Sequence, residues 1–168
     1  MLQTIGKLEA ARRQLALAIR LFFQEADPIA VHTLASAAYQ VLHDISESRG
    51  LIGLVKANPN VREEKRNEWQ GILNRAQNFF KHAGRDPTGT FDFDPELTRV
   101  FLFDAVLLYA QLSNQPFQEG TLYSAWFAVQ YDRFLVDGVL KDYINAMKQR
   151  GLDPDDFVVI QTLLSDSK

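Results

Sequence analysis

Three polar residues near the middle of the chain have the types and spacing that phosphate chemistry requires. Arg75, Asn78 and His82 stand at i, i+3 and i+7, so on one α-helix they fall within a narrow band. A histidine can move a proton near neutral pH, and an arginine can neutralise a phosphoryl oxygen. An asparagine one turn before the histidine can hold its ring or a substrate hydroxyl. Together these side chains supply what metal-free cleavage of an RNA phosphodiester needs.

The helix that carries this band is expected at 60–83, with the band on its flank. At 100° per residue its core face consists of Trp69, Ile72, Leu73, Ala76, Phe79, Phe80 and Ala83. Residues on the flank of such a face are expected to be half-buried at a groove between helices. A polar side chain there is oriented and partly desolvated.

A second polar band is expected on the helix at 28–49, again beside its apolar face. Its members are His32, Ser36, Tyr39 and His43, at i, i+4, i+7 and i+11. All three histidines of the chain therefore lie on helix flanks, and the two flanks form one polar seam if they face each other. The residues expected to bind a ligand or to support His82 are His32, Ser36, Tyr39, His43, Lys81, Arg85 and Asp86.

The same residues also have a purely structural interpretation, which stays open. Side chains of this kind on a helix flank bury their stems and keep their polar tips in water. His82 is expected in the last turn of its helix, where a cation complements the macrodipole. Arg85 and Asp86 could form a local ion pair that holds the following loop.

Metal binding receives little support from the spacing of candidate ligands. His32 and His43 lie 11 positions apart, which places them about 16 Å apart along one helix, too far to share an ion. One of them could join His82 and an acid such as Asp86 or Asp104, but there is no HxxxH or HExxH pair. The chain has no cysteine, so thiolate sites and disulfides are excluded. We therefore predict no metal and no cofactor.

Helix boundaries are marked by Asp-Pro pairs and by glycines. In such a pair the carboxylate accepts backbone N–H groups as the N-cap, and the proline suits the first helical position. A glycine just after the last helical residue often ends a helix. The pairs stand at 27–28, 94–95 and 153–154, and the glycines at 50, 84 and 151.

The chain is predicted to be an all-α helical bundle in a single domain. No segment alternates with period two over the length of a strand, and the short FDFD at 91–94 is expected as a loop pinned by its two aromatic rings. The expected helices are 3–25, 28–49, 60–83, 95–113, 121–135, 137–150 and 154–165.

Two of these helices are unusually apolar. The helix at 95–113 is apolar almost all round, which is typical of a central, buried element, so its Asp104 needs a partner or a cleft. The helix at 121–135 carries an aromatic stripe that predicts either core packing or a dimer face. The stripe comprises Tyr123, Phe127, Tyr131 and Phe134.

The residues around His82 resemble the HEPN (higher eukaryotes and prokaryotes nucleotide-binding) superfamily of small all-α domains. The match consists of Arg75-(six residues)-His82 and Asn78-Phe-Phe-Lys-His82. In that family an arginine usually precedes the asparagine directly, whereas here Gln77 holds that place and Arg75 stands two residues further back. The resemblance implies up-and-down packing and a homodimer in which the two motifs meet.

The resemblance also implies a function of the toxin or phage-defence type. Many members are metal-independent RNases and others are non-catalytic. For an active member, it assigns His82 to general acid–base catalysis, Arg75 to phosphate binding and Asn78 to orientation.

The overall composition is that of an ordinary soluble globular protein. Of its 168 residues, 46% are hydrophobic and 23% charged, and the net charge is −3, so no broadly basic surface and no DNA binding are expected. The first residues lack the layout of a signal peptide, and the most apolar run, 100–110, is short and contains Asp104. We therefore expect a cytoplasmic protein without a membrane span.

Three functions remain open on these grounds. The first is a metal-independent ribonuclease with His82 at its centre. The second is a non-catalytic bundle that binds a nucleotide, a small ligand or a protein partner through the same groove. The third is a structural homodimer that uses the aromatic helix at 121–135 as its interface.

Overall fold

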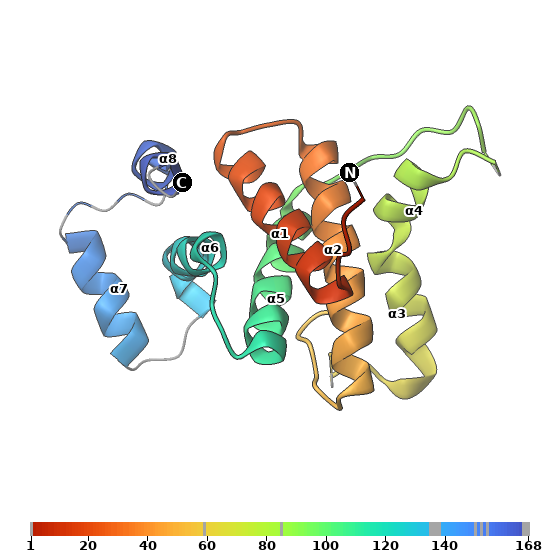
Figure 1. Cartoon of the computed structure of the whole chain (residues 1–168), viewed down its shortest axis with the longest axis horizontal. Coiled ribbons are helices and arrows are strands. Elements are labelled where there is room, and N and C mark those ends of the chain that lie inside the picture. Colours follow the sequence, from red (N-terminus) through yellow and green to blue (C-terminus); the bar gives the residue numbers. More distant parts are fainter. Residues whose placement is uncertain are drawn as a thin grey trace.

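The computed structural model describes all residues except 1, 59, 85, 135–138, 150, 152, 154 and 166–168. The described residues form helices and loops and contain no strand, which confirms the all-α prediction (Figure 1). The α-helices are α1 (Lys7–Phe23), α2 (Pro28–Ser48), α3 (Arg66–Leu73), α4 (Arg75–Lys81), α5 (Glu96–Ser113), α6 (Gln118–Gln130), α7 (Val139–Gln149) and α8 (Phe157–Ser165). Two short 3-10 helices are η1 (Glu63–Lys65) and η2 (Asp132–Phe134).

Helices α1, α2 and α5 pack against one another and form the centre of the molecule (Figure 1). Helix α5 was expected there from its apolar sequence, and its Leu102, Ala105 and Leu108 have no exposed surface. Helix α6 packs on α1 and α5, and helix α4 packs on α2. Burial of these apolar faces is the main stabilising contribution to such a bundle. No helix in the described part of the chain is long and apolar enough to cross a bilayer.

The aromatic stripe of α6 belongs to the interior at the positions that can be assessed. Tyr123 is fully buried, and the ring of Phe127 stacks on Phe103 of α5 at a centroid distance of 4.2 Å. Helix α6 begins and ends earlier than predicted, and the side chain of Phe134 lies outside the described residues. These contacts support the core interpretation of the stripe.

Two of the Asp-Pro pairs stand at helix starts: Asp27 is the N-cap of α2 as predicted, whereas Pro95 itself is the N-cap of α5 and Asp94 precedes it. The Asp27 carboxylate accepts the N–H groups of Ile29 and Ala30 at 2.8 and 3.2 Å. The Asp94 carboxylate accepts the N–H of Glu96, the first residue of α5, at 2.9 Å. Each acid satisfies donors that a helix leaves unpaired at its N-terminus.

The remaining boundary signals agree only in part with the structure. Gly50 and Gly151 follow α2 and α7 with φ angles of +69° and +83°, a left-handed conformation that favours glycine. Gly84 does not adopt a positive φ, and α4 ends before it. Helix α8 begins at Phe157 instead of at residue 154, and Pro154 lies outside the described residues.

The largest error in the predicted elements concerns the segment 60–83, which is not one helix. It is divided into η1, α3 and α4, and Asn74 separates α3 from α4. Asparagine is a weak helix former, since its side chain competes for backbone hydrogen bonds. The core face also differs from the predicted one, because Gln77 is buried while Ile72 and Phe79 are 56% and 37% exposed.

Candidate functional site

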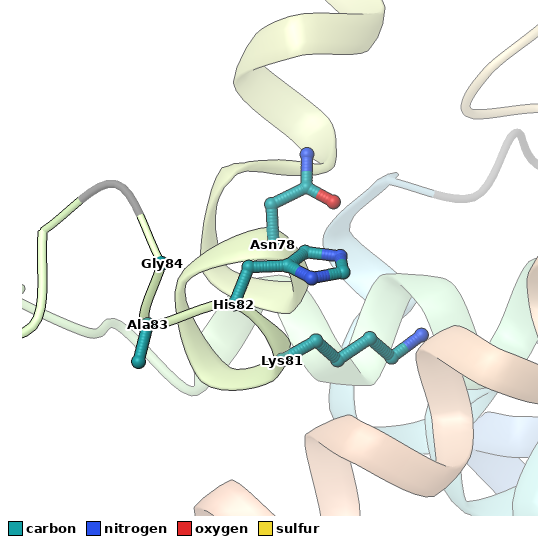
Figure 2. A pocket seen from close by; sticks show the side chains of 5 residues that line it. All are labelled: Asn78, Lys81, His82, Ala83 and Gly84. Atoms are coloured by element: carbon teal, nitrogen blue, oxygen red, sulfur yellow. The ribbon is translucent and has the colours of Figure 1, made fainter.

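Asn78, Lys81 and His82 line an open depression at the end of α4. The depression has a volume of about 740 Å³ and is completed by Ala83 and Gly84. In Figure 2 the Asn78 amide lies above the His82 ring, and the Lys81 side chain extends past both. All of these side chains are exposed. The structure therefore brings a proton-transfer group, an amide and an ammonium to one accessible surface.

The expected half-buried groove around His82 is not present. His82 follows the last residue of α4 and has an extended backbone, with φ −131° and ψ 103°, so it does not lie in the last helical turn. Asn78 on α4 and His82 just after it are both exposed to solvent. Their exposure allows a large ligand to reach them.

Arg75 does not line the depression. Its guanidinium carbon lies 5.4 Å from the centroid of the Phe91 ring, in a cation–π contact with the loop 82–95. Among the described residues, Lys81 is therefore the cation that lines the depression together with His82. The exposed Asp86 lies in a turn of the same loop, in which the Gly89 N–H donates to the Asp86 carbonyl at 3.4 Å.

Arg85, which was expected to bind a ligand or support His82, lies outside the described residues. The predicted ion pair between Arg85 and Asp86 is outside them for the same reason.

The predicted polar band of α2 is buried inside the protein. Its members are His32, Ser36, Tyr39 and His43, and none is more than 4% exposed. The band therefore does not border the depression. It lies in the interior, on the side of the bundle where α2 packs against α4 and α5.

His32 connects α2 with α5 and with the elements around the depression. Its Nδ1 is hydrogen-bonded to Thr98 Oγ1 at 2.8 Å, and its Nε2 to Ser36 Oγ at 3.1 Å. Burial lowers the pKa of the imidazole from 6.5 to about 4, so the ring is neutral near pH 7. The rings that surround it belong to Phe80 of α4, Phe93 of the loop 82–95 and Phe101 of α5. The FDFD loop is thus held by its aromatic rings, as predicted.

Asp104 has the partners that its burial requires. Its carboxylate accepts the Tyr39 hydroxyl at 2.7 Å and the N–H groups of Leu54 and Val55 at 2.9 Å each. The Tyr39 oxygen in turn accepts the N–H of Lys56 at 3.0 Å. Burial, followed by the Asp104 charge, raises the pKa of the Tyr39 phenol far above 10. Asp104 and Tyr39 therefore hold the segment after α2 against α2 and α5.

The Lys56 side chain is a buried cation that we did not predict. It is 4% exposed, its ammonium donates a short hydrogen bond to the Gln40 side-chain oxygen, and it lies 5.5 Å from the Tyr39 ring centroid. Burial is the main cause that lowers its pKa, and the positive charge of Lys81 acts in the same direction. The sequence signal was a single charged residue in the otherwise apolar run LIGLVKA at 51–57.

His43 is a second buried histidine of α2. Its Nε2 lies 3.6 Å from Glu47 Oε1, and its ring stacks near Tyr39. Burial is the largest cause that lowers the pKa of His43, although the Glu47 carboxylate opposes it. Across the described residues, no group of three histidine or acidic side chains could hold a metal ion.

Comparisons with known proteins do not place this chain in a family. No protein-family model, no curated protein and no solved structure matches it.

Proposed function

We propose that this protein is a HEPN-like RNA-binding protein that cleaves phosphodiester bonds without a metal at the depression beside α4. The observation that carries the proposal is that Asn78, Lys81 and His82 line one accessible surface. His82 accepts the proton of a ribose 2′-hydroxyl while its oxygen attacks the phosphorus, and as an imidazolium it donates a proton to the leaving 5′-oxygen. Lys81 neutralises the phosphate, and Asn78 orients the imidazole or the hydroxyl.

The distribution of ion pairs supports an anionic ligand at this surface. Several cations elsewhere in the described structure pair with carboxylates, namely Arg12, Arg20, Arg66, Arg99 and Lys148, whereas others such as Lys7 and Arg49 do not. Within the part of the chain that the structure describes, neither Arg75 nor Lys81 has a carboxylate partner. Lys56 adds a further positive charge close to Lys81. A phosphate is attracted to such a place even on a protein of net charge −3.

A second candidate is binding of RNA or a nucleotide without cleavage. The contact between Arg75 and Phe91 favours it, because the HEPN resemblance assigns Arg75 to the phosphate and the depression does not include it. Lys81 then holds the phosphate alone, and the geometry for catalysis is incomplete.

Cleavage of RNA in excess EDTA tests the proposal, with His82→Ala and Lys81→Ala beside the wild type. The catalytic proposal expects cleavage that His82→Ala lowers by about 10²- to 10⁴-fold. It also expects unchanged melting temperatures, since both side chains are exposed. Lys7→Ala, an exposed lysine on α1, is the matched control and should cleave like the wild type. If the wild type and all variants bind RNA and none of them cleaves it, the second candidate is established. If the wild type neither binds nor cleaves RNA, both candidates are excluded.

The proposal includes the homodimer that the HEPN resemblance implies. Light scattering after size-exclusion chromatography measures the mass in solution directly. We expect twice the 19.1 kDa of one chain. A dimer that neither binds nor cleaves RNA would instead favour the structural homodimer.

A further inference from the structure

Arg75, Phe79 and Phe91 form a surface cluster on α4 and the loop 82–95, which we call the aromatic platform; Arg75 and Phe79 are exposed and Phe91 is half-buried. The Phe79 and Phe91 rings are stacked, with centroids 5.3 Å apart and an angle of 28° between their planes. The Arg75 guanidinium carbon lies 5.4 Å from the Phe91 centroid. Phe79 is 37% exposed although it is a large apolar side chain. The platform therefore offers aromatic surface and a cation to solvent.

The contacts that hold the loop do not depend on the aromatic platform alone. Phe80 and Phe93 lie behind it, 5.2 Å apart, and Phe93 lies 5.1 Å from the buried His32 ring. These inner rings attach the loop to α2. The exposed face of Phe79 is thus left for a contact outside the chain.

The aromatic platform and the depression share helix α4. Phe79 is the neighbour of Asn78 and precedes His82 by three residues, so it lies about one turn from the depression. The described structure gives the Arg75 guanidinium no hydrogen-bond acceptor. An arginine that rests on an aromatic ring keeps its planar donors available for a phosphate or a base edge.

We propose that the aromatic platform binds an unpaired nucleobase of single-stranded RNA while an adjacent phosphate lies at Lys81 and His82. This inference rests on the proposed function and names its substrate class. Bases of single strands stack on exposed aromatic side chains, and a cation beside the ring strengthens the contact. Paired bases in a duplex are not accessible in this way. Stacking uses the face that every base has, so single strands of different sequence should bind.

The test compares two short probes of equal length and charge by fluorescence anisotropy. One is a 2′-O-methyl oligouridylate, which cannot be cleaved through its 2′-oxygen, and the other is the same ribose-phosphate chain without bases. The wild type should bind the base-bearing probe about tenfold more tightly than the abasic probe. Phe79→Ala should remove this preference and leave the affinity for the abasic probe unchanged.

Three variants separate stacking from packing. Phe79→Leu keeps apolar contacts with the neighbouring rings but has no aromatic face, and it should behave like Phe79→Ala. Phe79→Trp keeps an aromatic face at this position, so it should bind the base-bearing probe more tightly than the abasic probe, as the wild type does. Ile72→Ala, which removes a 56% exposed apolar side chain on α3, should bind both probes like the wild type.

The outcomes distinguish this inference from the proposed function. Equal wild-type affinity for the two probes would overturn the aromatic platform as a base site and leave the phosphate site intact. A preference that persists in Phe79→Ala and Phe79→Leu would also overturn it, because the bases would then be bound elsewhere. Tighter binding of an annealed duplex than of the single strand would do the same. Failure of the wild type to bind either probe would overturn both proposals.

Discussion

The Tyr39 hydroxyl donates a 2.7 Å hydrogen bond to Asp104, a carboxylate that is 1% exposed within the apolar helix α5. The same carboxylate accepts two backbone N–H groups from the segment after α2, namely those of Leu54 and Val55. One buried acid thereby joins α2, α5 and a loop fifty residues away in the sequence. Its burial costs free energy that only these hydrogen bonds offset.

We expect Asp104→Ala to lower the free energy of unfolding by about 3–5 kcal/mol, because it leaves three donors without their acceptor. Tyr39→Phe should cost less, about 1–3 kcal/mol, because Asp104 keeps its backbone donors although the Lys56 N–H loses its acceptor. Urea denaturation followed by circular dichroism measures both. Asp92→Ala, at an exposed aspartate in the loop 82–95, is the control and should change stability by less than about 0.5 kcal/mol. Equal costs at 104 and 92 would contradict a structural role for Asp104.

Gly53 and Gly71 should respond in opposite directions to alanine. A Cβ on Gly53 would lie 3.1 Å from Asp104 Oδ2 and 3.3 Å from Leu108 Cδ1, and neither neighbour is free to move. We expect Gly53→Ala to destabilise the protein by about 1–3 kcal/mol. Gly71 lies inside α3 with nothing within 4 Å of its Cβ position, so Gly71→Ala should stabilise by about 0.5–1 kcal/mol. The same urea titrations measure both, and a stable Gly53→Ala variant would show that the segment can shift.

The buried His32 should make the protein lose stability in mild acid. Burial lowers its pKa from 6.5 to about 4, so between these values the unfolded chain binds a proton that the folded protein does not. The contribution of the neutral His32 to the free energy of unfolding is complete above pH 6.5 and is lost as the pH falls toward 4. At about 1.4 kcal/mol per pKa unit, the loss amounts to about 3 kcal/mol.

The comparison with His32→Gln isolates this contribution. The unfolding free energy of this variant should decrease less steeply than that of the wild type between pH 6.5 and pH 4. Some slope should remain, because burial lowers the pKa of His43 as well. Identical slopes for the two proteins would show that the pKa of His32 is the same in the folded and the unfolded protein, which would contradict the prediction.

Replacing Lys56 by methionine should leave the protein equally stable or stabilise it by up to about 2 kcal/mol near pH 7. The ammonium is buried with an amide oxygen as its partner, and methionine fills the same space without a desolvation cost. The difference should shrink as the pH rises from the lowered pKa of the buried amine toward 10.5, the ordinary pKa of lysine, because the amine is then neutral in the folded protein as well as in the unfolded chain. Lys7→Met, on the surface of α1, provides the control. A loss of more than about 1 kcal/mol in Lys56→Met would show that its contacts with Gln40 and Tyr39 outweigh the cost of burial.

Much of the fold could be predicted because helices are local structures. The N-cap role of Asp27, the central place of α5 and the loop at 91–94 all follow from residue types within a few positions of one another. The same holds for the need of Asp104 to find a partner, since an apolar helix with one acid is evident in the sequence. Backbone hydrogen bonds and periodic burial act over one or two turns, so the local sequence determines them.

The arrangement of the candidate site was decided by tertiary structure. Helical periodicity continues across Asn74, and only the packing of α4 on α2 reveals that the helix is broken and that His82 is exposed. Likewise, Arg75 meets Phe91 through a loop that folds back, and Lys56 is buried by the position of its segment against α2. The sequence by itself determined which residues could act on a phosphate. Contacts between residues that are distant in the chain decide which of these side chains share a surface. Such contacts produce no local periodicity, so they cannot be predicted from a single sequence.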